Sequence, residues 1–210
     1  MNYPSLREIA FNYMNNISSS AHDLSHVIRV ENNVIKLKEG IKLDEDVLFI
    51  STWFHDSGRY EELQTGIGHE IISARIVEEE LPKIQNFPID KIPKIVYCIK
   101  SHRYTSNLKP NLLEAQILQD ADRLDALGAI GLARLFAHDN KRKLYHEKDP
   151  FYELQRELEK NKYTLDQYFK KMRKIKDTLN TDRAKKIATI RIRFMNLFLE
   201  QFKKEIEGKI

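Results

Sequence analysis

The stretch Trp53-Phe54-His55-Asp56-Ser57-Gly58-Arg59 constrains this chain more than any other. Two large apolar side chains lead directly into an adjacent histidine and aspartate, and a glycine and an arginine follow. An apolar run of this kind belongs in a protein core, where a carboxylate costs several kcal/mol unless it is paired or bound to a metal. We therefore interpret His55 and Asp56 as two ligands of a metal ion and expect further ligands elsewhere.

Composition favours an all-α protein. The 210 residues include seven glycines and six prolines, which is few for a β-rich chain with many tight turns. Cys98 is the single cysteine, so an intrachain disulfide and a cysteine-rich zinc site are both excluded. Its apolar neighbours favour core packing over a role as nucleophile.

Charge and targeting patterns indicate a cytoplasmic protein. A net charge of +4 permits an anionic ligand without demanding nucleic acid. The N-terminal residues lack the basic and apolar regions of a secretory signal, and no apolar run approaches the length of a membrane span. We therefore expect no membrane segment.

Apolar residues at helical spacing predict the order of elements. Asp23 and Asp44 are candidate N-caps, and residues 57–67 are expected to form a loop over the site. Residues 150–178 and 182–207 are predicted to form an amphipathic hairpin that packs on the first part. We expect one domain over residues 1–210, with a C-terminal helical extension at 140–210. The other helices are predicted at residues 4–18, 24–38, 45–56, 68–81, 90–102, 111–123 and 126–139.

Further candidate ligands lie on the apolar faces of these helices. His26 continues a stripe with Val30 and Val34, and His102 extends the stripe of Ile92, Ile95 and Ile99. His69 and Asp122 complete the set. Histidine and aspartate without thiolate suit Mn, Fe, Co, Ni, Zn or Mg. Because neighbouring helical residues differ by about 100°, His55 and Asp56 can share an ion only near a helix end, which Ser57-Gly58 supplies.

Two longer motifs support the same set. Ala21 to Val30 reads Ala-His-Asp-x-x-His-x-x-Arg-Val, and Asp120 to Ala129 reads Asp-Ala-Asp-Arg-Leu-Asp-Ala-x-Gly-Ala. With the His55-Asp56 pair between them, residues 20–136 resemble the HD-domain metal-dependent phosphohydrolase superfamily. The resemblance implies a helical bundle in which a metal ion is held by four residues: His26, His55, Asp56 and Asp122.

The resemblance also implies a substrate class and leaves the number of ions open. His69 and His102 resemble the two additional histidines with which binuclear members hold a second ion. No Gly-Tyr-Pro motif follows His102, so the chain departs from the cyclic-dinucleotide phosphodiesterases. The similar bacterial members imply hydrolysis of nucleotide phosphates, including pyrophosphohydrolysis of nucleoside triphosphates.

Phosphate chemistry needs positive charge around the metal, because the ion activates water and polarises a phosphoryl oxygen. Arg59 is expected to contact the phosphates, with Lys100 and Arg103 on either side of His102. Asp56 can both bind the ion and orient the attacking water. If only one ion binds, His69 and His102 are free to contact phosphate or to protonate the leaving group.

Several residues have simpler interpretations. Asp120 and Asp122 lie on nearly opposite helix faces, and Asp125 is expected in a salt bridge or behind the ligands. Arg75 and Arg123 are either phosphate contacts or ion-paired groups. Three other histidines are expected outside the ligand set, His22 at a helix start and His138 and His146 at the surface.

Other functions fit the same sequence less well. A non-catalytic module that senses nucleotides would keep the ligands, and a nucleotide phosphodiesterase or monophosphatase would share the metal chemistry. The basic residues of 170–193 are most simply a solvated helix face, although a nucleic-acid stripe is a third interpretation. Homo-oligomerisation is open.

Overall fold

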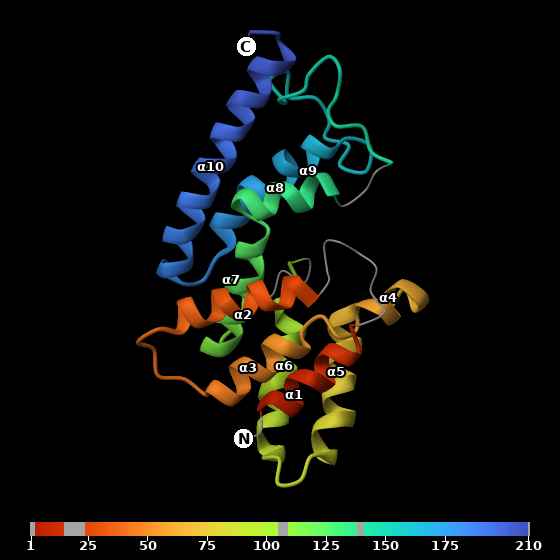
Figure 1. The fold of residues 1–210 in the computed structure, drawn as a ribbon, viewed down its shortest axis with the longest axis vertical. Coiled ribbons are helices and arrows are strands. Elements are labelled where there is room, and N and C mark those ends of the chain that lie inside the picture. The colour runs from red at the N-terminus through yellow and green to blue at the C-terminus, as the bar shows by residue number, and fades with distance from the viewer. Residues whose placement is uncertain (1–2, 15–23, 105–108, 138–140, 210) are drawn as a thin grey trace. The chain divides into compact units, whose positions relative to one another are not determined.

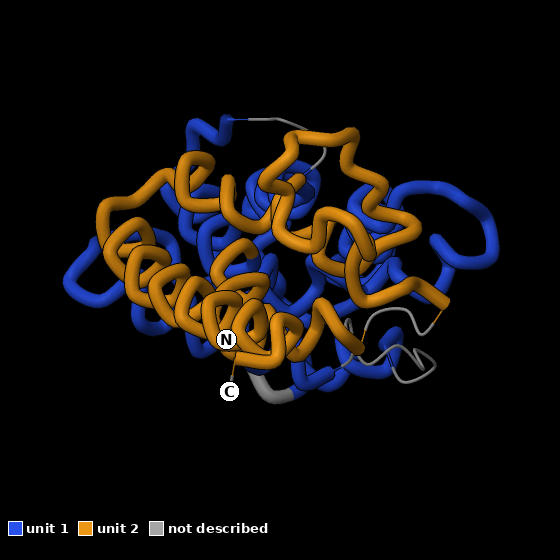
Figure 2. Tube along the Cα trace, turned by 90° about the horizontal axis from the view of Figure 1, so that it is seen from above, with its two compact units in different colours: residues 1–122 blue, residues 123–210 orange. Residues whose placement is uncertain are grey.

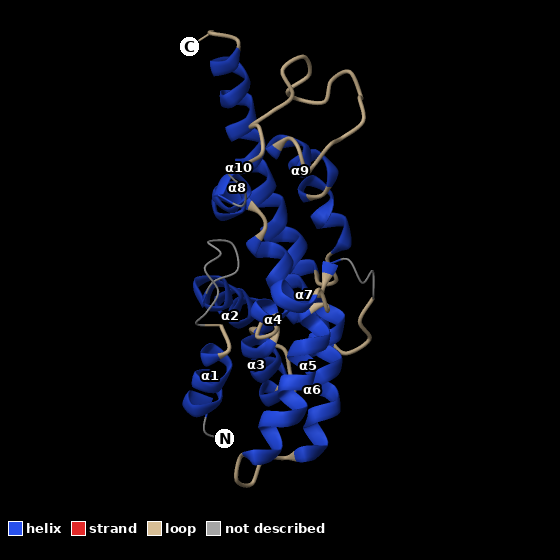
Figure 3. Ribbon diagram, turned by 90° about the vertical axis from the view of Figure 1, so that its right-hand side faces the viewer, coloured by secondary structure: helices blue, strands red, loops and turns tan. Residues whose placement is uncertain are grey.

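A computed structural model describes residues 3–14, 24–104, 109–137 and 141–209. Helices account for the regular structure of these residues, which contain no strand and one isolated bridge between Lys143 and Tyr163 (Figures 1 and 3). The prediction of an all-α protein is confirmed. The α-helices are α1 Tyr3–Asn12, α2 Leu24–Lys38, α3 Glu45–Phe54, α4 Arg59–Thr65, α5 His69–Glu80, α6 Ile92–His102, α7 Leu113–Asp125, α8 Gly128–Ala137, α9 Thr164–Lys170 and α10 Asp182–Ile206. Short 3₁₀ helices cover Leu81–Lys83, Ile89–Lys91 and Met172–Thr178.

The chain divides into two compact units, residues 1–122 and 123–210, with the boundary inside α7 (Figure 2). In the first unit, α6 packs against α3 and α5, and α3 also contacts α1 and α2. Phe54, Leu48, Ile95 and Ile99 are fully buried between these helices. Cys98 is buried as well, and burial raises the pKa of its thiol to about 12, so it is core packing as predicted.

Helix starts and stops follow local chemistry. The Asp44 side chain accepts a hydrogen bond from Val47 N at 3.3 Å and caps α3, as predicted. The predicted loop 57–67 is wrong over its centre, because α4 forms there. Every residue of α4 is at least partly exposed, so no apolar periodicity marked it. The second candidate cap, Asp23, and residues 15–18 lie outside the described residues.

The predicted helix 150–178 is wrong in its first half. Residues 150–163 form turns in which Tyr152 and Gln155 have positive φ angles of 59° and 51°. Asp149 accepts hydrogen bonds from the backbone of Glu153 at 2.8 Å and Leu154 at 3.3 Å. These side-chain contacts satisfy backbone groups that a helix would otherwise pair.

The second unit is organised by α10, which Thr181 caps and which packs on α8. Gly128 has a φ of +77°, and a Cβ there would lie 3.1 Å from the Arg191 side chain of α10.

Among the described residues, none of the helices combines the length and the apolar character of a membrane span. The single-domain organisation with a C-terminal extension stays a prediction.

Candidate metal centre

The end of α3 brings His55 and Asp56 inward together. Both residues are completely buried, with His55 Nε2 3.8 Å from Asp56 Oδ2. The α-helix stops at Phe54, and the backbone continues as a turn in which Ser57 N donates to Phe54 O at 3.1 Å. This departure from helical geometry allows two adjacent side chains to face one point.

Ser73 on α5 holds this turn in place. Its buried hydroxyl donates to His55 O at 3.0 Å and accepts from Gly58 N at 2.9 Å. Gly58 has an ordinary φ of −80°, so its role is close approach and not backbone conformation. A Cβ at this position would lie 2.5 Å from the backbone oxygen of His69 and 2.9 Å from Ser73 N.

Gly58→Ala is therefore expected to push the turn away from α5. We expect it to reduce stability by about 1–3 kcal/mol through overpacking and to weaken metal binding, because His55 and Asp56 would move apart from the remaining ligands. Gly66→Ala is the matched control, since Gly66 has a φ of +73° and open space around it. It should cost about 1–2 kcal/mol of conformational strain and leave metal affinity unchanged. Denaturant unfolding and metal titration of both variants measure the difference; equal metal affinities would contradict this account.

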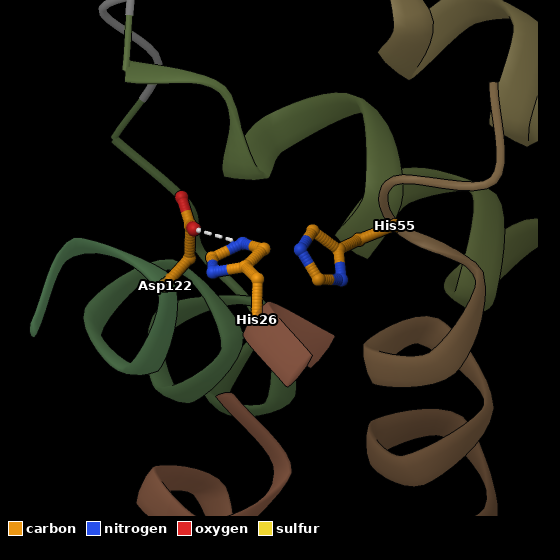
Figure 4. A group of neighbouring side chains, drawn as sticks. All are labelled: His26, His55 and Asp122. Carbon is orange, nitrogen blue, oxygen red and sulfur yellow. Dashed lines mark ion pairs between the residues drawn. The ribbon is translucent and has the colours of Figure 1, made fainter. Parts of the chain in front are cut away.

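Two other helices complete one side of the cluster. His26 on α2 places Nε2 3.3 Å from Asp122 Oδ1 on α7 and 3.6 Å from Asp56 Oδ2. Figure 4 shows His26 and Asp122 side by side, with the ring of His55 facing them. The four predicted ligands thus converge in the first unit, and atoms of His26, His55 and Asp122 lie within 4.8 Å of one another.

The remaining two histidines, His69 and His102, lie near the other carboxylate oxygen of Asp56, Oδ1. His69 Nε2 and His102 Nε2 are 3.4 Å and 3.7 Å from Asp56 Oδ1. These two nitrogens are 3.3 Å from each other. Asp56 therefore lies between two pairs of histidines, with one carboxylate oxygen directed to each pair.

Hydrogen bonds on the far side of each ring determine which nitrogen faces the centre. His55 Nδ1 lies 2.6 Å from Thr52 O, and His102 Nδ1 lies 2.6 Å from Ile99 O. Because a carbonyl oxygen only accepts, Nδ1 carries the proton and Nε2 keeps its lone pair. His55 Nε2 is buried and makes no hydrogen bond among the described residues. Metal-binding histidines are typically held in this way.

The electrostatics give the protonation states that ligands require. Burial lowers the pKa of His55 to about 4 and that of His69 to about 2, although Asp56 opposes both shifts. Burial alone would raise the pKa of the Asp122 carboxyl, but its hydrogen bond to His26 and the nearby histidines hold it below its usual range. At neutral pH the imidazoles of His55 and His69 are therefore neutral and the Asp122 carboxylate is charged, so these donors fit a divalent cation.

Two of the three predicted phosphate contacts lie beside the centre. Arg59 Nε donates to Asp56 Oδ1 at 3.0 Å, and its Nη1 lies 3.3 Å from Glu62 Oε2. Arg103 pairs with Glu62 at 3.1 Å and with Glu70 at 2.6 Å. Lys100 is exposed on α6, two residues before His102 and so about 200° around the helix from it. The structure does not bring Lys100 to the site.

The remaining candidates have structural contacts. Arg75 is exposed and pairs with Glu61 at 2.6 Å, Arg123 donates to Thr178 O, and Asp125 forms a salt bridge of 2.7 Å with Arg134. His146 is half-exposed and packs on the Tyr163 ring. His22 and His138 lie outside the described residues.

Sequence reasoning missed Glu62 and Glu70 as neighbours of the site. Glu62 lies on α4, a helix that the sequence pattern did not reveal, and Glu70 directly follows His69. Nothing in the composition around them distinguishes them from other surface acids. Ser73 had a detectable signal, because it lies four residues after His69 on the same helix face.

Comparison with known proteins gives consistent matches. The sequence pattern of the HD domain matches residues 23–127. The Bacillus subtilis protein YpgQ is 28% identical over 205 residues, which cover 90% of this chain and 87% of YpgQ. An HD-superfamily hydrolase from Bacillus thuringiensis is 27% identical, with a TM-score of 0.71 over 97% of this chain and 96% of that one. The crystal structure of YpgQ in complex with ADP shares the fold, with a TM-score of 0.71 over 98% of each chain and 23% identity in the superposition.

Proposed function

We propose that this chain, which belongs to the HD-domain family, is a metal-dependent phosphohydrolase acting on nucleotide phosphates. The observation that carries the proposal is the position of Asp56 between two pairs of histidines, with the Arg59 guanidinium bound to the same carboxylate. Ligands for a cation and positive charge for a phosphate thus meet at one buried point. We also propose that the protein is cytoplasmic and that it has one hydrolase domain with a C-terminal extension.

Four side chains would hold a divalent ion, with Mn²⁺ as the leading candidate: His26, His55, Asp56 and Asp122. When bound, such an ion lowers the pKa of its water toward neutrality and polarises a phosphoryl oxygen. Asp56 is positioned to orient the attacking water, since its oxygens face both histidine pairs. Arg59 and Arg103 would bind the phosphates as planar guanidinium groups, the geometry that matches phosphate oxygens.

His69 and His102 have two roles open to them. Hydrogen bonds to Glu62 and to Ile99 O leave both Nε2 atoms as acceptors, 3.3 Å apart. Two lone pairs at this distance do not hydrogen-bond each other, so a cation or a donor belongs between them. The pair can therefore hold a second metal ion. Contact with a substrate phosphate, or transfer of a proton to the leaving group, would first require one Nε2 to take up a proton, for example from the attacking water.

The nucleotide substrate is supported by one relative. YpgQ, which covers nearly the whole chain, has been crystallised with ADP. In this chain, candidate metal ligands beside two guanidinium groups would suit cleavage of a phosphoanhydride. We propose nucleoside triphosphate pyrophosphohydrolysis as the specific form of the activity.

The test is a panel of nucleoside mono-, di- and triphosphates with Mn²⁺ or Mg²⁺. Free phosphate and pyrophosphate are measured separately, and the nucleotide products are identified. We expect pyrophosphate from triphosphates. Phosphate alone would indicate a monophosphatase, and no turnover with any metal bound would contradict the enzyme. Thermal stabilisation by nucleotide without product would instead indicate a nucleotide-sensing module.

A further inference from the structure

Glu62 is a shared acceptor for three side chains at the edge of the metal centre. Its Oε2 atom lies 2.9 Å from His69 Nδ1 and 3.3 Å from Arg59 Nη1. Its Oε1 atom lies 3.1 Å from Arg103 Nη2. One carboxylate on α4 thus joins the start of α5 to the residue that follows α6.

We propose that Glu62 is a positioning residue that fixes the His69 ring with Nε2 toward the centre and holds Arg59 and Arg103 for phosphate binding. The second part of this inference rests on the proposed function. The first part concerns the orientation of one imidazole ring and holds for a hydrolase and for a sensor alike.

Donor and acceptor chemistry determines which tautomer His69 adopts. A carboxylate only accepts, so its contact with His69 requires the proton on Nδ1. Nε2 then keeps its lone pair, which faces Asp56 Oδ1 at 3.4 Å. Backbone carbonyls set the same tautomer in His55 and His102, whereas His69 stands at the start of α5 and depends on a side chain for it.

Glu62 also helps to orient the planar guanidinium groups of Arg59 and Arg103. Arg59 is held at two nitrogens, Nε by Asp56 and Nη1 by Glu62. Arg103 is held at both terminal nitrogens, by Glu62 and by Glu70. A guanidinium held at two points is oriented before the substrate arrives, so less conformational entropy is lost on binding.

Glu62→Gln and Glu62→Ala test the proposal. An amide can donate to Nδ1 as well as accept from it, and alanine offers no acceptor, so both should weaken the preference for the Nδ1–H tautomer. The Glu62 side chain is 20% exposed, so these substitutions should leave the fold intact. Glu61→Gln is the matched control, because the adjacent Glu61 is exposed and pairs with Arg75 at 2.6 Å.

The first measurement is ¹⁵N NMR of the histidine side chains, in the metal-free protein and with one equivalent of Zn²⁺ bound. Because Zn²⁺ on His69 Nε2 would itself keep the proton on Nδ1, the metal-free spectrum decides the tautomer. We expect the Nδ1–H form of His69 in the wild type and in Glu61→Gln, and a shift toward Nε2–H in at least the alanine variant. The second is turnover on the nucleotide panel. We expect kcat to fall by about 10- to 100-fold in both Glu62 variants, the usual effect of losing a partner behind a site residue, with unchanged metal content.

Retention of the Nδ1–H tautomer in both Glu62 variants would overturn the positioning role, whatever their turnover. A wild-type protein that hydrolyses no nucleotide would instead overturn the proposed function, while the NMR comparison would still decide the role of Glu62.

Discussion

Asp56→Ala is expected to remove metal binding and hydrolysis together. Asp56 Oδ2 faces His26 and His55, and Oδ1 faces His69 and His102, so this one carboxylate contacts both pairs of histidines. Loss of a partner behind a ligand already costs about 10- to 100-fold in metal affinity, so loss of this ligand should cost more. Metal catalysis supplies several kcal/mol to the transition state, and about 4 kcal/mol corresponds to roughly a 10³-fold loss of turnover.

Metal content after dialysis and turnover with added Mn²⁺ measure these effects. Circular dichroism and thermal unfolding show whether the variant is folded. Asp90→Ala is the control, because Asp90 is an exposed carboxylate in the 3₁₀ turn before α6. It should behave as wild type. An Asp56→Ala protein that retained bound metal and turnover would show that the chemistry occurs elsewhere.

The sequence predicted several of the residues that meet, for a physical reason. His26 and His102 each continue an apolar stripe, so burial of the stripe also buries the histidine. Ser57-Gly58 predicted a helix end at which the adjacent His55 and Asp56 could converge. The structure ends α3 two residues earlier than predicted, at Phe54, and places both residues in the turn that follows. Residues that are buried as part of an apolar stripe can therefore be predicted from the sequence alone.

Features that depend on specific polar contacts could not be predicted from the sequence pattern. The turns at residues 150–163 are held by Asp149 and by an ion pair of 2.7 Å between Arg156 and Asp166, a partly buried contact that apolar periodicity does not encode. In the same way, Glu62 contacts His69, Arg59 and Arg103 together only because α4 places it against α5 and the residue after α6. The pattern of one helix does not reveal which acid among several will do so.

Addition of Mn²⁺ to the metal-free protein is expected to raise its thermal unfolding midpoint. Ligand that binds only the folded state at about 100 times its Kd adds roughly 2.7 kcal/mol to the free energy of unfolding. For a chain of this size that corresponds to about 5–10 °C. Differential scanning calorimetry with and without Mn²⁺ measures the shift. His55→Ala should lose most of it, whereas a variant that kept the full shift would remove His55 from the ligand set.

The pH dependence of the Mn²⁺-induced rise in unfolding midpoint separates two effects of His55: its protonation on unfolding and its binding of the metal ion. The pKa of His55 is about 4 in the folded metal-free protein, because burial disfavours the imidazolium, and it should be about 6.5 after unfolding. The unfolded chain therefore binds more protons between these values, so the contribution of His55 to the stability of the metal-free protein is complete above pH 6.5 and falls by about 3 kcal/mol toward pH 4. His69, whose pKa is lowered to about 2, adds a loss of the same sign. Nε2 of the folded protein stays deprotonated over most of that range, so the increment from Mn²⁺ should persist to about pH 5 while the total stability declines. An increment that disappeared at pH 6.5 would mean that the ligand histidine is accessible to water and not buried as the structure shows.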